Sequence, residues 1–73
     1  LFRSDVRRGD LIFFNTQRRV YPGHVGIVIE VMPTGNVKFI HAATSTGVTI
    51  STLLGSPYYE TRFVGLRRVV DER

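Results

Sequence analysis

Cysteine is absent from all 73 residues of the sequence. The chain by itself therefore offers no disulfide, no thiolate metal ligand and no cysteine nucleophile, and its redox compartment stays undetermined. The sequence also lacks an apolar run long enough to cross a membrane, a signal peptide and any long amphipathic helical pattern. What remains is a series of short apolar stretches separated by turn residues, which predicts a protein made almost entirely of strands.

Length and composition predict one small folded domain over residues 1–73. A hydrophobic content of 42% is that of a folded protein. Because the chain begins at Leu1 and not at methionine, we expect a processed product, a fragment or an excised piece, with any targeting segment upstream. The net charge of +4 is carried by separate arginine pairs at residues 7–8, 18–19 and 67–68. Such scattered charge is typical of a solvated surface, and it would also favour anionic polymers without choosing among them.

The two histidines of the sequence lie in two short apolar stretches, residues 23–29 with His24 and residues 38–43 with His41. Alternation along the first stretch predicts one face, expected to be core, with Val25, Ile27, Ile29 and Val31, and a second face with His24, Gly26, Val28 and Glu30. Turn formers at residues 33–36 predict that the two stretches pair as an antiparallel hairpin. With Glu30 opposite Val37, His24 lies diagonal to His41, so that one imidazole can orient the other directly or through a water.

The other predicted elements are short. Residues 4–10 indicate a turn that ends near Asp10, and the apolar run Leu11–Phe14 predicts a strand covered on both faces. A polar loop over residues 15–23, a turn at 44–47, strands at 48–51 and 63–70, and one helical turn through residues 57–60 with Ser56 as N-cap complete the chain. Gly26 predicts a close approach by another backbone or a helix.

This set of elements leaves the sheet without a second layer. Neither the Leu11–Phe14 run nor the face of His24 has an obvious cover in the sequence, and an open sheet of four or five strands needs one. We therefore expect a helical layer that the chain does not supply.

Five segments in a fixed order carry a resemblance to a known family. They are residues 9–16 (GDLIFFNT), 24–29 (HVGIVI), 38–42 (KFIHA), 47–51 (GVTIS) and 62–69 (RFVGLRRV). Together they resemble the C-terminal half of the NlpC-type cell-wall cysteine peptidases, over almost the whole chain. The resemblance implies an α+β, papain-like antiparallel sheet half-domain, without the N-terminal helix that carries the family's cysteine.

The resemblance also implies a function. His24 would be the general base and His41 the orienting residue of a cysteine peptidase that cleaves stem-peptide bonds of peptidoglycan, such as D-glutamyl-diaminopimelate. The nucleophile would come from a preceding cysteine-bearing segment, and the site would lie outside the cytoplasmic membrane and need no cofactor. The pair of histidines by itself agrees with these roles, because thiol catalysis needs an imidazole base that a partner holds in one tautomer.

Several other interpretations stay open at this point. The chain could be a non-catalytic piece or degenerate domain that binds a partner or the cell wall. Two histidines can suggest a metal, although only Glu30 offers a further carboxylate ligand, and a metal site is disfavoured. Arg8-Gly9-Asp10 could be an adhesion motif, which is less favoured than a turn into a strand. Basic pairs beside aromatic residues suggest a nucleic-acid-binding β module, although no recognition-module signature accompanies them, and no nucleic-acid partner is expected.

Overall fold

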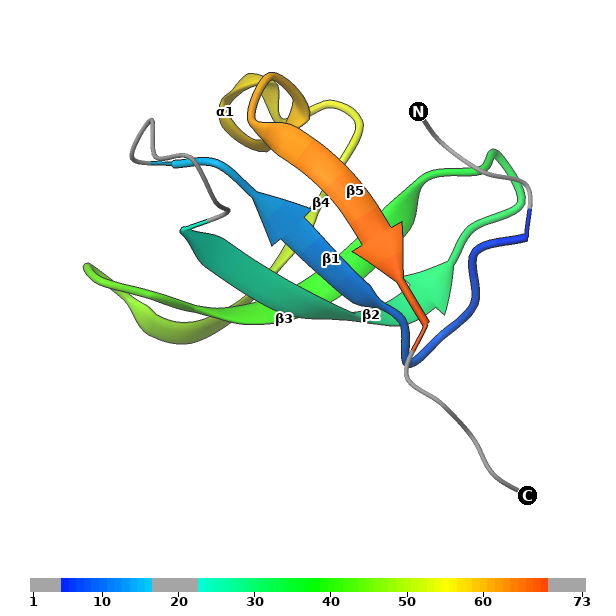
Figure 1. Ribbon diagram of the computed structural model, residues 1–73, viewed down its shortest axis with the longest axis horizontal. Coiled ribbons are helices and arrows are strands. Elements are labelled where there is room, and N and C mark those ends of the chain that lie inside the picture. Colours follow the sequence, from blue (N-terminus) through cyan, green and yellow to red (C-terminus); the bar gives the residue numbers. More distant parts are fainter. Residues whose placement is uncertain (1–4, 17–22, 69–73) are drawn as a thin grey trace.

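The computed structural model describes residues 5–16 and 23–68, which form one five-stranded antiparallel sheet and one helical turn (Figure 1). The strand order across the sheet is β4-β3-β2-β1-β5. The elements in chain order are β1 (Leu11–Phe14), β2 (His24–Val31), β3 (Val37–Ala43), β4 (Gly47–Thr52), α1 (Pro57–Glu60) and β5 (Phe63–Arg67). The predicted strands and the helical turn are therefore confirmed, whereas residues 17–22 of the predicted loop and residues 69–70 of the predicted last strand lie outside the described residues.

The β2–β3 turn and the start of α1 form at the residues where the sequence predicted them. Between β2 and β3 the backbone N–H of Gly35 donates to the carbonyl of Met32 at 2.9 Å, and Gly35 adopts a φ of 95° that favours glycine. Ser56 takes the N-cap position of α1 and Pro57 its first turn, as predicted. The Ser56 side chain makes no capping hydrogen bond, however, and its carbonyl accepts the N–H of Glu60 at 2.8 Å.

One connection decides which face of the sheet is covered. β4 and β5 lie at opposite edges, so the segment between them, residues 53–62, must cross the sheet, and it carries α1 over the face that bears both histidines (Figure 1). This histidine face holds the buried core, and Tyr59, Phe63 and Leu66 pack against it. The core side chains are Val6, Ile12, Phe14, Val28, Val37, Phe39 and Leu53.

The expected core face of β2 was therefore wrong. Val25 and Ile27 are both 46% exposed, whereas Val28 on the histidine face is fully buried. Alternation correctly separated the two faces near His24, but both carry apolar residues, and only the crossover segment shows which one is covered. For the same reason β1 is covered on one face and not on both, because Ile12 and Phe14 are buried while Leu11 and Phe13 are half-buried.

The pairing of β2 with β3 contains a bulge. Ile27 lies opposite Ile40 and Val28 opposite Phe39, which is the predicted register for this end of the hairpin. The register shifts between Val28 and Glu30, so that Glu30 lies opposite Lys38 and not opposite Val37 as expected. A bulge of one residue explains why strict alternation fails beyond Val28.

Asp10 ties the start of β1 to the end of β5. Its side chain is 6% exposed and accepts hydrogen bonds from the Arg7 backbone N–H at 2.9 Å and from Arg68 Nε at 3.0 Å. The Arg68 guanidinium, with burial opposing it, lowers the pKa of the Asp10 carboxyl. The predicted turn into a strand is therefore confirmed, and the carboxylate of the Arg8-Gly9-Asp10 tripeptide is not presented for adhesion.

Candidate active site

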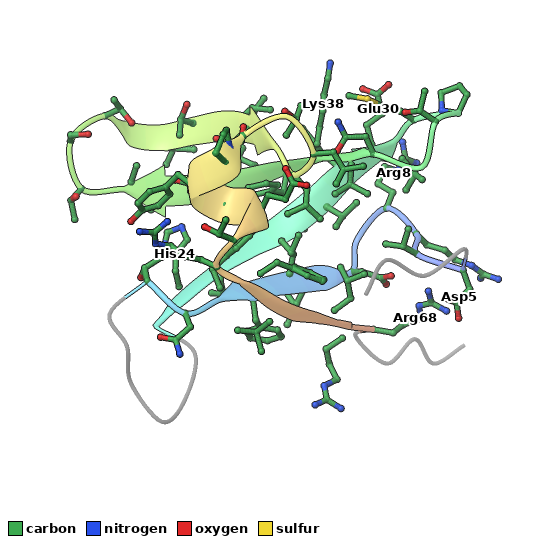
Figure 2. All side chains as sticks on the ribbon, turned by 90° about the horizontal axis from the view of Figure 1, so that it is seen from above. Asp5, Arg8, His24, Glu30, Lys38 and Arg68 are labelled. Carbon is green, nitrogen blue, oxygen red and sulfur yellow. The ribbon has the colours of Figure 1, made fainter. Side chains whose placement is uncertain are left out.

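The two histidines meet on the histidine face of the sheet. Nε2 of His24 lies 2.9 Å from Nδ1 of His41, and the two rings stand nearly perpendicular with their centroids 5.0 Å apart. The predicted pairing of the imidazoles is thus a direct hydrogen bond. His24 begins β2, and it lies at the opposite end of the sheet from Glu30 and Lys38 (Figure 2).

His41 is the inner member of the pair. It is 5% exposed, and its ring packs on Phe39 and Tyr59, with centroids 4.8 and 5.1 Å away. Burial, followed by the charge of His24, lowers the pKa of His41. His41 is therefore neutral at neutral pH and can accept a hydrogen bond at one ring nitrogen while it donates at the other.

His24 is the outer member of the pair. It is half-buried, and its ring lies nearly parallel to the ring of Tyr59, at an angle of 25° and a centroid distance of 6.3 Å. Within residues 5–16 and 23–68 its Nδ1 atom has no hydrogen-bond partner, since the single hydrogen bond of the ring is made by Nε2. His24 therefore has one nitrogen engaged by His41 and a second that is available for proton transfer.

A cleft of about 390 Å³ adjoins His24. Strand ends of β2 and β3, the turn after β3 and α1 supply its walls. Its lining residues are Thr16, Gly23, His24, Ala42, Ala43, Thr44, Ser45, Tyr58 and Tyr59. An open cleft with hydroxyls, small side chains and one imidazole suits an extended polar chain better than a compact apolar ligand.

Tyr58 and Tyr59 lie in different environments: Tyr59 packs against the core, and Tyr58 lies at the cleft. Tyr59 contacts Phe14, Phe39 and both histidine rings, and burial raises its pKa, so the phenol stays protonated. Tyr58 is 50% exposed, and the Arg62 guanidinium lies 3.9 Å above its ring. The prediction that one tyrosine packs under the helical turn is confirmed for Tyr59, while Tyr58 forms part of the cleft rim.

Ser51 is the residue of the site that sequence reasoning missed. Its Oγ lies 2.9 Å from Nε2 of His41, so that His24, His41 and Ser51 form one continuous hydrogen-bonded row across β2, β3 and β4. In the β3–β4 register Ser51 lies opposite Phe39 and so two positions from the partner of His41. The alternation of β4 together with this register would have found it.

Glu30, the carboxylate considered as a third metal ligand, lies away from the histidine pair. It is 3.5 Å from Lys38 Nζ, at the other end of the strand (Figure 2). Among the described residues, no three histidine, cysteine, aspartate or glutamate side chains are grouped so that they could hold a metal ion. The same part of the chain contains no helix that is long and apolar enough to cross a membrane.

Comparison with known proteins shows the family to which the chain belongs. The sequence profile of the NlpC/P60 family matches residues 1–68. The chain belongs to the NlpC/P60 family, as its motifs predicted.

Particular relatives agree with this assignment. The chain is 44% identical over 71 residues to the murein DD-endopeptidase MepS/murein LD-carboxypeptidase of Escherichia coli, covering 93% of this chain and 32% of that protein. It is 38% identical over 68 residues to murein DD-endopeptidase MepH of Escherichia coli, with 93% and 23% coverage. It is 39% identical over 69 residues to peptidoglycan DL-endopeptidase CwlO of Bacillus licheniformis, with 93% and 14% coverage. The chain thus spans about a third or less of these relatives.

Proposed function

We propose that the chain is the base-bearing half of a peptidoglycan endopeptidase that hydrolyses stem-peptide amide bonds with a cysteine nucleophile supplied by a segment outside these 73 residues. The observation that carries the proposal is the 2.9 Å contact of His24 Nε2 with His41, which leaves Nδ1 of His24 without a partner in the described part of the chain, beside a cleft. Identity with enzymes named as murein endopeptidases supports the substrate class. The bond between D-glutamate and diaminopimelate is our candidate for cleavage, and the cell envelope is the expected location.

In the proposed reaction His24 acts as general base and then as general acid. Nδ1 of His24 removes the thiol proton, and the thiolate attacks the carbonyl carbon of the scissile amide. The imidazolium returns this proton to the amide nitrogen as the carbon–nitrogen bond breaks, which leaves a thioester. Water, deprotonated by His24, then hydrolyses the thioester and regenerates the thiol. His41 holds the His24 ring and stabilises the imidazolium through its Nδ1 lone pair.

The second face of the sheet supports a further layer that would carry the nucleophile. Val25, Ile27, Val48 and Ile50 are between 46% and 72% exposed, and the first three line a groove of about 390 Å³. We call this surface the open face; it consists of Leu11, Val25, Ile27, Ile40, Val48 and Ile50. Such a large exposed apolar surface favours burial against another segment. A cysteine-bearing helix packed there would have to reach His24 around the β2 end of the sheet, where His24 lines a hollow together with Phe13 and Val25 from the other side of the sheet.

The test of this function uses the full-length protein and purified peptidoglycan. His24→Ala should reduce muropeptide release to background while the circular dichroism spectrum is unchanged, since it removes the only group proposed to transfer the proton. Glu30→Ala is the matched control, because Glu30 is exposed and lies in the same strand at the opposite end (Figure 2). Wild-type hydrolysis by the His24→Ala protein would refute the assignment.

A second candidate function follows from the missing cysteine. A chain with no thiol and an exposed apolar face could instead be a binding piece that docks on a partner or on the cell wall. Intact-mass measurement of the purified protein, with and without a thiol-alkylating reagent, separates the two. A species that gains one alkyl group supports the peptidase, whereas a single unmodified species of 8.3 kDa supports the binding function.

A further inference from the structure

The hydrogen-bonded row of His24, His41 and Ser51 allows only two arrangements of the protons in its hydrogen bonds. Each of its two hydrogen bonds, both 2.9 Å long, has one proton, and a neutral imidazole has one N–H and one lone pair. If His24 donates from Nε2, then His41 accepts at Nδ1 and must carry its proton on Nε2, which donates to Ser51 Oγ. In the reverse order Ser51 donates to Nε2 of His41, Nδ1 of His41 donates, and His24 accepts at Nε2.

Only the first order gives His24 a basic Nδ1. In the reverse order the proton of neutral His24 must sit on Nδ1, and the nitrogen without a partner has no lone pair to accept another. The first order is also the only one possible once His24 is an imidazolium, because both of its nitrogens are then donors. Ser51 must accept in this state, which a freely rotating hydroxyl can do.

Burial makes the acceptor on β4 necessary. His41 is 5% exposed, so an Nε2–H without a partner would remain unsatisfied in the interior. Thr49 is the direct register partner of His41, yet among the described residues it makes no hydrogen bond to either histidine. Among the described residues Tyr59 is the other titratable group in contact with the pair, and burial, which raises its pKa, keeps it protonated and uncharged at neutral pH.

We propose that Ser51 is a positioning residue: its hydroxyl accepts the Nε2–H of His41, fixes His41 in the Nε2–H tautomer and thereby leaves the basic lone pair of His24 on Nδ1. The tautomers are a property of the folded chain. Their effect on catalysis rests on the proposed function.

The test is ¹⁵N NMR on the full-length protein labelled at histidine, with resonances assigned by His24→Gln and His41→Gln. Above the titration range, the wild-type spectrum should show both histidines protonated at Nε2. Ser51→Ala should move the His41 proton to Nδ1, because a buried N–H without a partner is rarer in native proteins than a buried acceptor without one. Ser51→Thr, which keeps the hydroxyl, and Thr49→Ala, which removes a hydroxyl and a methyl group on the same strand and face, should both keep the wild-type tautomers.

Two results would overturn the proposal. One is a wild-type His41 protonated at Nδ1, a result that refutes the proposal even if the Ser51→Ala protein does not fold. The other is a folded Ser51→Ala protein with unchanged tautomers.

Kinetics separate this inference from the proposed function. Ser51→Ala should lower kcat about 10- to 100-fold, by analogy with groups that orient metal-bound histidines, with KM changed less than about twofold and with recovery in Ser51→Thr. Shifted tautomers with an unchanged kcat would keep Ser51 as the tautomer-setting residue and reject His24 as the base. A lowered kcat with unchanged tautomers would reject the role of Ser51.

Discussion

Gly26 offers a direct test of how tightly β2 and β3 hold the histidine pair. A Cβ atom at Gly26 would lie 2.9 Å from Cδ2 of Phe39, 3.0 Å from the carbonyl oxygen of Ile40 and 3.3 Å from Cβ of His41. Each of these distances is shorter than an ordinary van der Waals contact. In Gly26→Ala, β3 must therefore move away from β2, and His41 moves with it.

The magnitude follows from comparison with Gly65. A Cβ atom at Gly65, in β5, would meet nothing within 4 Å, and neither glycine has a positive φ. Both alanine variants gain about 0.4 to 1 kcal/mol from the reduced entropy of the unfolded chain. Only Gly26→Ala also adds the cost of overpacking, about 1 to 3 kcal/mol. The two variants should therefore differ in free energy of unfolding by about 1 to 3 kcal/mol, with Gly26→Ala the less stable.

Urea unfolding followed by circular dichroism measures this difference, and the peptidoglycan assay gives a second measurement. Gly26→Ala should lower turnover even where the protein is fully folded, because movement of β3 away from β2 lengthens the hydrogen bond of 2.9 Å between the imidazoles. Gly65→Ala should keep wild-type turnover. Equal unfolding free energies for the two variants, within about 0.5 kcal/mol, would show that close packing at Gly26 does not hold the pair.

Three further predictions concern other parts of the structure. His41→Ala should leave measurable turnover, since orientation contributes less than proton transfer, and a loss as complete as that of His24→Ala would instead indicate His41 as the base. The Asp10 carboxyl has a pKa lowered from 3.8, so its contribution to the free energy of unfolding is complete above pH 3.8 and is lost as the pH falls through the folded pKa. In urea unfolding curves measured over a series of pH values, Asp10→Asn should lack this loss of stability in acid. Ile50→Lys should cost the full-length protein roughly 2 to 5 kcal/mol if another segment covers the open face, and less than about 0.5 kcal/mol if the open face is solvated.

The strands and the contact between the two histidines could be predicted from the sequence. Turn formers at residues 33–36 and 44–47 bound the strands closely, and the register at Ile27 and Val28 brought His24 to His41 as predicted. These features depend on residues close together in the chain, where turn chemistry and alternation are strong. The bulge after Val28 was missed because no residue there distinguishes a bulge from regular pairing.

The covered face could not be predicted, because it depends on a connection between distant strands. β4 and β5 show no local sign that they occupy opposite edges, yet this placement alone sends α1 and Tyr59 across the histidine face. Ser51 was missed for a related reason. Its role needs the register of β4 on β3, and a serine in a strand has no pattern of its own that indicates a histidine partner.

The difference in burial between the two histidines bears on which one is the base. His41 is enclosed by Phe39, Tyr59 and Ser51, and burial together with the charge of His24 lowers its pKa. A positive charge on His41 is therefore disfavoured, whereas His24 borders the cleft and is more exposed. A neutral His41 is what the proposed order of protons needs, since only a neutral ring can accept at Nδ1 and donate at Nε2 together. The packing of α1 on His41 thus favours His24 as the group that takes and returns the proton, although both residues have the same side chain.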